Sequence, residues 1–475
     1  MKRKLLTGLS LLLISSMALA QTTFEPKATI NASTGANPYT IDSGLLDNDA
    51  YVDIVIGTDG GNTVEWYKNN GDGTFAASVT LVATGTEALL YVEGVHIADV
   101  NGDGNNDILA TSYGNSNLVW FANNGDGTFA DAVTIGTSLI SGAGTVTTGY
   151  IDADSTLDVA VVAYGSGDVF WFANNGSGVF TGPYTIASVP TSGPGDIELT
   201  DYDNDGDLDA VIAFSDAGTI EVYDNNLLPS GAGVVSFTKY DNTVSSGNGY
   251  LFDIDVKDVN DDGILDIIKA DSEPVGGMAG VAYYTKDTSG TATTFTETTI
   301  TTTTIHTSKT AVNDFDNDTY NDLIVTNGYT SGLDVLWFES NTTGGFETEF
   351  SLDDSHQSIF DITVNDFDND GDLDFATVSY YQSDLNWFEN KLITLDVEDN
   401  TLQEITMYPN PTKNNLYFKG NINGDLNVSV YNVLGKRVIH SAVKTGQALD
   451  VSKLNNGVYI IKFNDYNTTY KFVKQ

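Results

Sequence analysis

Short stretches in which apolar and polar residues alternate recur along most of the chain, and turns rich in Gly, Asn and Asp separate them. Alternation with a period of two is typical of β-strands that bury one face, whereas an amphipathic helix repeats its apolar residues about every 3.6 positions. The stretches between the turns show the period of two and not the helical one. The pattern therefore predicts an all-β protein built from many short strands.

An Asp-rich nonapeptide divides these strands into seven similar units, whose last Asp residues are separated by 54, 51, 51, 57, 56 and 52 residues. Four short strands in about 53 residues form the unit of a propeller blade, and seven blades lie within the usual range. We therefore predict a seven-bladed β-propeller, with an open solenoid as the structural alternative. Each unit also carries an aromatic pair or its equivalent, namely Trp66-Tyr67, Trp120-Phe121, Trp171-Phe172, Val222-Tyr223, Tyr283-Tyr284, Trp337-Phe338 and Trp387-Phe388.

The seventh unit lacks its outer strand, and the region that follows residue 20 supplies a matching sequence. The unit stops after Asn390, and the segment from Phe24 to Ile30 resembles the outer strands that begin at Phe129 and Phe180. A strand that comes from the other end of the chain closes a ring and removes two exposed sheet edges. We therefore predict that this segment completes the seventh blade.

The nonapeptide has the spacing of a calcium loop, Asp-x-Asp/Asn-x-Asp-Gly-x-x-Asp. Carboxylates at alternate places of a tight turn converge on one point, and several hard oxygen ligands suit Ca²⁺. The apolar second place should plug the loop into its blade. An EF-hand is excluded, because the twelfth place holds no Glu and the surroundings are strand-like. The five predicted sites are Asp99, Asn101, Asp103 and Asp107; Asp201, Asp203, Asp205 and Asp209; Asp258, Asn260, Asp262 and Asp266; Asp314, Asp316, Asp318 and Asp322, with Thr319 in place of Gly; and Asp366, Asp368, Asp370 and Asp374.

The first and third copies of the nonapeptide depart from this pattern. Leu45 and Tyr150 occupy the first ligand place, and Ala50 and Ser155 replace the Gly. Each copy has thus lost one carboxylate and the residue that permits the sharp turn. We expect weaker metal sites here, made of Asp47, Asp49 and Asp53 in the first copy and of Asp152, Asp154 and Asp158 in the third.

These loops, with this blade length, resemble the FG-GAP/VCBS repeats of propellers of the integrin α-subunit type. The resemblance covers about residues 23 to 392. It implies a calcium-binding propeller, whereas the ligand is left open, because such propellers host adhesion, sugar binding and some enzymes.

Both ends of the chain carry export signals. Residues 1–20 have a basic start, a short apolar run and an Ala-Leu-Ala site, which is typical of a cleaved signal peptide. Residues 393–404 read as a linker. Residues 405–475 contain Tyr408-Pro409-Asn410-Pro411, then Asn432-Val433-Leu434-Gly435-Lys436 and Leu454-Asn455-Asn456-Gly457. These motifs resemble the type A sorting domain of type IX secretion substrates, which implies a small Ig-like β-sandwich, export by the type IX secretion machinery, and a secreted or outer-membrane-surface location. A generic β-sandwich binding module is the alternative.

Charge and composition narrow the range of partners. Residues 21–403 carry 61 acidic and 8 basic residues, whereas residues 404–475 carry 4 acidic and 9 basic residues. So strong a negative charge repels nucleic acid and anionic lipid, and a transmembrane segment is not expected. Cysteine is absent, so an exported protein must gain stability from its core or from bound metal rather than from disulfides.

The innermost strand of each unit precedes the Asp loop, so that every second residue should face the axis of the ring. The resulting acidic channel could bind a cation, an amine or a sugar, or form only a hydrated wall. The residues predicted to face it are Asp42, His96, Thr147, Glu198, Asp255, Ala311 and Thr363, and, two places earlier, Thr40, Gly94, Thr145, Asp196, Asp253, Lys309 and Asp361.

The chain has four His and none of the common nucleophile or phosphate-binding motifs. This favours a secreted or cell-surface calcium-binding propeller that acts as a binding or adhesion module for glycan or protein ligands. The alternative is a secreted carbohydrate-active hydrolase or lyase that uses the channel carboxylates. Aromatic residues on the loops that connect blades would favour a sugar binder, and two close carboxylates with shifted pKa values in a pocket would favour the enzyme.

Overall fold

The computed structural model describes residues 24–391 and 406–475 apart from short gaps. The chain divides into two compact units, Met1–Leu392 and Ile393–Gln475. The predicted signal peptide, residues 1–20, and the predicted linker, residues 393–404, lie outside the described residues. The gaps are 138–139, 153, 228–234, 241, 246–248, 261, 273–279, 288–292, 302–305, 329–333, 341–344, 356–357, 420–424, 433–435, 445–446 and 464–467.

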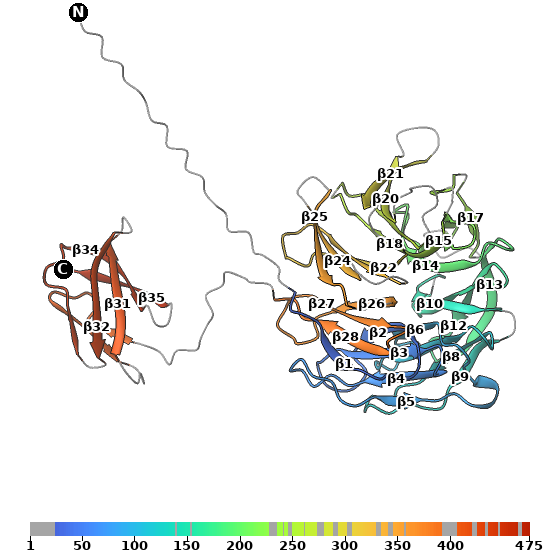
Figure 1. The fold of residues 1–475 in the computed structure, drawn as a ribbon, viewed down its shortest axis with the longest axis horizontal. Helices are drawn as coiled ribbons and strands as arrows, with labels where there is room; N and C mark the ends of the chain where they lie inside the picture. The colour runs from blue at the N-terminus through green and yellow to red at the C-terminus, as the bar shows by residue number, and fades with distance from the viewer. Residues whose placement is uncertain are drawn as a thin grey trace, which may run out of the picture. The chain divides into compact units, whose positions relative to one another are not determined.

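The described part of the first unit forms seven four-stranded antiparallel sheets, here called the first to seventh blades in chain order (Figure 1). The innermost strands are β2 (Pro38–Gly44), β6 (Gly94–Ala98), β10 (Ala143–Gly149), β14 (Pro194–Thr200), β18 (Leu251–Lys257), β22 (Thr307–Asn313) and β26 (Ile359–Asn365). The second strands are β3 (Asp53–Thr58), β7 (Asp107–Ser112), β11 (Asp158–Ala163), β15 (Asp209–Phe214), β19 (Asp266–Asp271), β23 (Asp322–Asn327) and β27 (Asp374–Ser379). The third strands are β4 (Thr63–Tyr67), β8 (Asn117–Phe121), β12 (Asp168–Asn174), β16 (Thr219–Asn225), β20 (Val281–Asp287), β24 (Val335–Ser340) and β28 (Asp384–Phe388). The outermost strands are β5 (Val79–Leu81), β9 (Val133–Thr137), β13 (Phe180–Ser188), β17 (Phe237–Lys239), β21 (Thr294–Thr301), β25 (Phe346–Asp353) and β1 (Ala28–Asn31), and a short 3₁₀ helix (Gly85–Glu87) follows β5.

The innermost strands are neighbours around a closed ring. Strand β2 contacts β6, and these contacts continue through β10, β14, β18, β22 and β26 back to β2. An open solenoid brings no such contact between its first and last sheets. The all-β class and the propeller architecture predicted from the sequence are confirmed, and the solenoid alternative is wrong.

The hydrophobic core lies between adjacent blades. The second strand of every blade is buried along its whole length. Val55 and Trp66 of the first blade pack in one cluster with Ile108 and Phe121 of the second. Because both faces of each sheet meet a neighbouring blade, the second strands are mostly apolar after their initial Asp.

Strand β1 completes the seventh blade, as predicted. It pairs with β28, with Ala28 opposite Trp387, and in Figure 1 the blue β1 lies beside the orange β28. Phe24 forms a further bridge to Asn390. The Phe24 ring packs against Phe375, with 5.2 Å between the ring centroids, and also meets Phe315 and Trp337. The two ends of the propeller sequence therefore close the ring together.

The second unit is a small β-sandwich, as predicted. One sheet contains β29 (Thr406–Tyr408), β30 (Asn415–Lys419) and β33 (Ala448–Asp450), and the other contains β32 (Arg437–Lys444), β31 (Asp425–Asn432), β34 (Gly457–Phe463) and β35 (Thr468–Lys474). Leu416 and Phe418 of the first sheet share a core with Val430 and Ile461 of the second. None of the helices in the described part of the chain has the length and apolar character needed to cross a bilayer.

Candidate metal loops and axial channel

The seven Asp loops join the innermost strand of each blade to the second strand, and the last Asp of each loop is the first residue of that second strand. Its buried carboxylate accepts the backbone N–H of the second loop place; Asp209, for example, accepts from Tyr202 at 3.0 Å. The same bond occurs in all seven loops. The side chain at the second place is buried in the five complete loops, as predicted, and also in the other two: Leu46, Val100, Ile151, Tyr202, Val259, Phe315 and Phe367.

The first Asp of the five complete loops holds the backbone of the turn. Asp366 accepts the N–H groups of Asp370 at 3.1 Å and of Gly371 at 3.0 Å, and the other four loops repeat this arrangement. The sixth place has a positive φ in all five loops: Gly104 (89°), Gly206 (101°), Gly263 (82°), Thr319 (82°) and Gly371 (100°). This conformation explains the Gly of the pattern.

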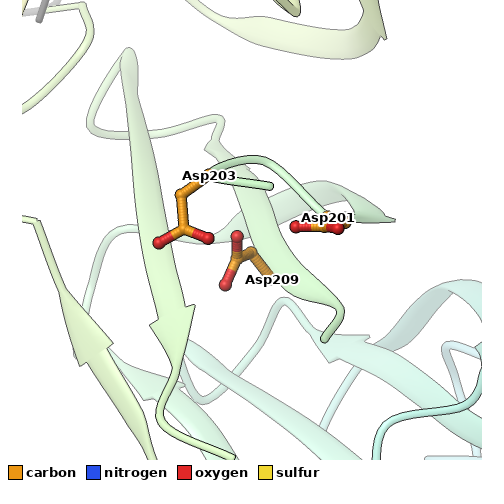
Figure 2. Close-up of side chains that lie close together, drawn as sticks. All are labelled: Asp201, Asp203 and Asp209. Carbon is orange, nitrogen blue, oxygen red and sulfur yellow. The ribbon is translucent and has the colours of Figure 1, made fainter. Parts of the chain in front are cut away.

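Three loops bring three carboxylates close together. In each triad, one oxygen atom of every residue lies within 4.8 Å of the others: Asp201, Asp203 and Asp209; Asp314, Asp316 and Asp318; and Asp366, Asp368 and Asp374. Figure 2 shows the first triad, on the loop between β14 and β15. Asp205, Asp322 and Asp370 stand outside these triads. The second and fifth loops, where Asn101 and Asn260 take the third place, form no such all-acid triad within the described residues.

The electrostatics of the loops fit a divalent cation. Burial raises the pKa of Asp374 to about 8, although hydrogen bonds from backbone N–H groups lower it. Asp207, at the seventh place of the fourth loop, has both carboxylate oxygens buried without a hydrogen-bond partner in the described part of the chain. Burial, and then the charge of Asp205, raise the pKa of Asp207 to about 7. Several close, unsatisfied carboxylate oxygens are the ligands that Ca²⁺ prefers.

A buried Asn that the sequence analysis missed connects the loops of neighbouring blades. The backbone N–H of Asn123 donates to Asp107 at 2.8 Å. Its side-chain amide donates to the carbonyl of Asn106 at 2.7 Å and to the carbonyl of Leu46, in the preceding blade, at 2.9 Å. The available signal was an Asn two places after the aromatic pair. The same bond to the preceding blade is made by Asn69, Asn174, Asn225 and Asn390.

Substitution of this Asn should weaken the contact between blades. We expect Asn123→Ala to lower the free energy of unfolding by about 1–3 kcal/mol, because buried carbonyl and N–H groups lose their partners. Urea unfolding followed by Trp fluorescence measures the change. Asn124→Ala is the matched control, since the Asn124 side chain donates only to Thr128 in an exposed turn. Equal losses in the two variants would contradict the bridging role.

The first and third loops are closed by other contacts. Lys68 Nζ forms salt bridges with Asp47 and, at 2.7 Å, with Asp49. In the third loop the Thr156 hydroxyl donates to Asp154 at 2.6 Å. Ala50 and Ser155, at the sixth place, are not among the described residues that have a positive φ. The departures in sequence are therefore accompanied by a different backbone turn.

A cavity of about 1040 Å³ lies on the axis of the ring, between the innermost strands. Thirteen of the fourteen residues predicted to face the channel line this cavity. The exception is Thr363, whose hydroxyl pairs with that of Ser43 at 2.7 Å. The lining also includes intervening residues of the innermost strands, such as Ile41 and Val95.

Many channel carboxylates hold adjacent blades together. Asp361 accepts the backbone N–H of Ile41 at 2.9 Å, and Asp42 accepts that of Ile97 at 2.8 Å. Each donor belongs to the innermost strand of the next blade. These carboxylates therefore have a structural role, whatever the channel binds.

The channel wall of the fourth to sixth blades combines Lys309 with several acids. Lys309 Nζ lies 2.6 Å from Asp253 and 3.7 Å from Asp196. Glu198 differs from these acids, because no described donor is within hydrogen-bond distance of its carboxylate. Burial, followed by the charges of Asp255 and Asp196, raises the pKa of Glu198 well above its usual range.

Aromatic side chains line the cavity at the end away from the Asp loops. Tyr39, Phe252 and Phe360 lie at the starts of innermost strands, and Tyr113 and Tyr164 directly follow second strands, at the opposite end from the loops. The aromatic belt consists of Tyr39, Tyr113, Tyr164, Tyr250, Phe252, Phe360, Tyr380 and Tyr381. All eight are linked by ring contacts of 5.1–6.2 Å between centroids or by the 3.0 Å hydrogen bond between the Tyr250 and Tyr164 hydroxyls. The sequence analysis missed this belt.

Protein-family models match both units of the chain. An FG-GAP-like repeat matches residues 46–110, 99–161, 150–212 and 314–377, and each match runs from one Asp loop into the second strand that follows the next loop. A secretion system C-terminal sorting domain matches residues 406–475. No curated protein matches the chain.

Solved structures with a similar arrangement have low sequence identity. A lectin of Agrocybe aegerita, described as recognising non-reducing terminal N-acetylglucosamine, is 18% identical, with 71% of this chain and 81% of that chain covered and a TM-score of 0.45. The periplasmic gluconolactonase PpgL of Pseudomonas aeruginosa is 10% identical, with 71% and 97% covered and a TM-score of 0.46. A protein of Lactobacillus plantarum is 13% identical, with 66% and 86% covered and a TM-score of 0.44. Likeness at this level identifies no site or ligand.

Proposed function

We propose that this protein, which carries FG-GAP-like repeats ahead of a secretion system C-terminal sorting domain, is a calcium-stabilised binding module for extracellular glycan or protein ligands. The resemblances to both families seen in the sequence are confirmed by the family matches. The sorting domain indicates that the type IX secretion machinery delivers the propeller to the cell surface or the extracellular space.

Calcium is the ion that the loops favour. In the fourth, sixth and seventh blades, the triads present carboxylate oxygens that lie within 4.8 Å of one another. Extracellular calcium modules bind with Kd of about 10⁻⁴ to 10⁻³ M, which suits an ion that supports structure outside the cell. The predicted ligands of these three loops would hold the calcium ions. The second and fifth loops would hold calcium in the same way, with Asn as the ligand at the third place.

The binding role rests on the cavity at the ring axis. A concave site that combines aromatic faces with a few polar groups is typical of small-molecule and glycan binding. The eight aromatic residues of the belt gather at one end of the channel, where the innermost strands begin and the second strands end. One of them, Tyr381, is 64% exposed. A channel that served only as a hydrated wall would have no need of this belt.

A glycan array probed with the calcium-loaded protein tests the binding role. We expect a restricted set of glycans to be bound, and Tyr381→Ala to reduce these signals. Tyr184→Ala is the matched control, because Tyr184 is also exposed but lies on the outermost strand β13. If no glycan is bound, a screen against cell-surface proteins remains, and failure of both screens would refute the proposal.

A glycan-cleaving enzyme is the second candidate, and the carboxylates of the fourth and fifth blades favour it. Burial, and then the charge of Asp255, raise the pKa of Glu198 well above its usual range, and burial raises the pKa of Asp255 to about 6. An acid with a raised pKa beside an ionised carboxylate is the pair that glycoside hydrolysis uses. Release of new reducing ends from the bound glycans would establish this activity. The Glu198→Gln variant should lose this release and still bind the glycans.

A further inference from the structure

Glu93 lies at the aromatic end of the channel, directly before β6 of the second blade. Its half-buried carboxylate has no hydrogen-bond donor among the described residues. Burial, and then the charge of Asp59, raise the pKa of Glu93 to about 8. Asp59 itself accepts the hydroxyl of Tyr380 at 2.5 Å. Carboxylates removed from water normally have a donor or a cation as a partner, and Glu93 has neither among the described residues.

Tyrosines from several blades line the same cavity as Glu93. After burial, the charge of Glu93 is among the causes that raise the pKa values of Tyr113, Tyr250 and Tyr380. These three residues belong to the second, fifth and seventh blades, so the carboxylate is within electrostatic reach of both sides of the channel. All three are members of the aromatic belt.

The remaining charges of the cavity select the sign of a ligand. Eight carboxylates line it, against two lysines and one histidine. One of the lysines, Lys309, is already paired with Asp253 at 2.6 Å. A cleft lined by one sign of charge concentrates ligands of the opposite sign and repels the others, so the cavity favours cations.

We propose that the aromatic end of the channel binds a protonated organic amine, whose ammonium group pairs with Glu93 and lies against the rings of Tyr113, Tyr250 and Tyr380. This specifies the ligand class of the binding role proposed above and depends on it. Aromatic faces attract a cation within about 6 Å of the ring centroid, and a carboxylate adds a charge-assisted acceptor. A neutral sugar would leave Glu93 without a counter-ion, and a calcium ion would meet phenol rings where it needs six to eight oxygen ligands.

Isothermal titration calorimetry with 1,5-diaminopentane, in saturating calcium so that the Asp loops are filled, tests the proposal. The neutral isostere 1,5-pentanediol is the matched ligand. We expect the diamine to bind and the diol to bind at least about tenfold more weakly, since a charge-assisted bond is lost. Glu93→Gln should weaken diamine binding by about tenfold or more, and Tyr380→Ala should weaken it by about fivefold.

Asp131→Asn is the control variant, because it removes one carboxylate from an exposed position of the second blade outside the cavity. Equal melting temperatures of all variants show that folding is intact. Unchanged diamine affinity in Glu93→Gln, equal affinity for the diol, or no binding of the diamine overturns the proposal. Weaker diamine binding when the calcium concentration is raised further, beyond what fills the Asp loops, would also overturn the proposal and would assign the site to a divalent ion. The glycan array is a separate measurement. A negative calorimetry result would therefore overturn the amine site without refuting the binding role.

The first Asp loop carries an independent feature, a lysine among its ligand places. Lys68 pairs with Asp47 and Asp49, the third and fifth places, and these contacts raise the pKa of Lys68. Lys68 directly precedes Asn69, and the residues at this position in the fourth, sixth and seventh blades are Asp224, Glu339 and Glu389. Each of these three acids acts electrostatically on a carboxylate of its own loop. The position therefore faces the loop in every one of these blades.

We infer that the Lys68 ammonium group replaces the metal ion in the first loop, whereas an acid at the same position adds negative charge to the three loops that contain triads. The ligand set of the first loop does not fit calcium, because one carboxylate is missing and two are neutralised by the lysine. A bound cation and Lys68 would compete for the same oxygens.

Native mass spectrometry of the calcium-loaded protein counts the ions. We expect Lys68→Glu to bind one calcium ion more than the unaltered protein, and Asp49→Ala to bind the same number. Asp203→Ala, in a complete loop, is the control that should lose one ion. An unchanged count in Lys68→Glu with an intact melting temperature, or the loss of an ion in Asp49→Ala, refutes the replacement of metal by lysine.

Discussion

Removal of calcium by EDTA is expected to lower the melting temperature of the propeller by roughly 10 °C. Three loops hold carboxylate oxygens of three Asp residues within 4.8 Å of one another, and without a cation their repulsion is unrelieved. At a free calcium concentration of 100 times Kd, one site stabilises the folded state by about 2.7 kcal/mol, and three independent sites by roughly 8 kcal/mol. No disulfide takes over this role, because the chain has no cysteine.

Differential scanning calorimetry with and without EDTA measures the effect, and the sorting domain serves as an internal reference. The described residues of the sorting domain, within 406–475, form no acid triad, so the thermal transition of this domain should not move. Magnesium should restore less stability than calcium, because it requires a smaller, near-octahedral site. A propeller transition that is unmoved by exhaustive chelation would contradict the calcium assignment.

The calcium-free protein should also lose stability as the pH rises. Burial is the main cause that raises the folded-state pKa of Asp374 from 3.8 to about 8 and that of Asp322 from 3.8 to about 7. A carboxylic acid whose pKa is raised by folding stabilises the folded state fully below its unfolded pKa, and this contribution is lost as the pH passes the folded pKa. In EDTA, the free energy of unfolding should therefore decrease between about pH 4 and pH 8. Urea titrations across this range check the sign, and stability that increases with pH would contradict it.

The fold could be predicted because the Asp-rich repeat and the alternation of apolar and polar residues occur in every blade. The nonapeptide fixes where the innermost strand ends, and the period of two then fixes which side chains face the axis. Asp196 and Glu198, for example, line the channel as expected. The buried second places of the loops, such as Phe315 and Phe367, follow from the same repetition.

The aromatic belt could not be predicted, because it is assembled from single residues of different blades. Tyr39 and Tyr380 are separated by most of the propeller sequence, and only closure of the ring brings their centroids to 6.2 Å. The contacts of Lys68 were missed for a related reason. They form across a strand hairpin, 19 and 21 residues from their partners, whereas the loop pattern concerns only nine consecutive residues.

Removal of the N-terminal strand is expected to open the ring. A protein that begins at Asn31 loses the pairing of Ala28 with Trp387 and the packing of Phe24 against Phe375. Loss of a large aromatic side chain from a core alone costs about 3–5 kcal/mol when the chain is fully buried, and the deletion also exposes the edge of β28. An exposed edge strand pairs with other chains, so we expect aggregation or strand-exchanged dimers.

Size-exclusion chromatography with light scattering compares this truncated protein with one that begins at Gln21. Lys27→Ala is the control, because it removes the 3.2 Å salt bridge with Asp353 and the 3.0 Å hydrogen bond to Ser355 but keeps the β1 backbone, and it should cost no more than about 1 kcal/mol. A synthetic peptide of residues 21–31 should restore the monomer of the truncated protein by supplying the missing strand in trans. The outer edge of β28 presents unpaired backbone N–H and C=O groups, and a strand from the same chain or from another molecule can pair with them. If the truncated protein remains monomeric with unaltered stability, β1 does not close the propeller.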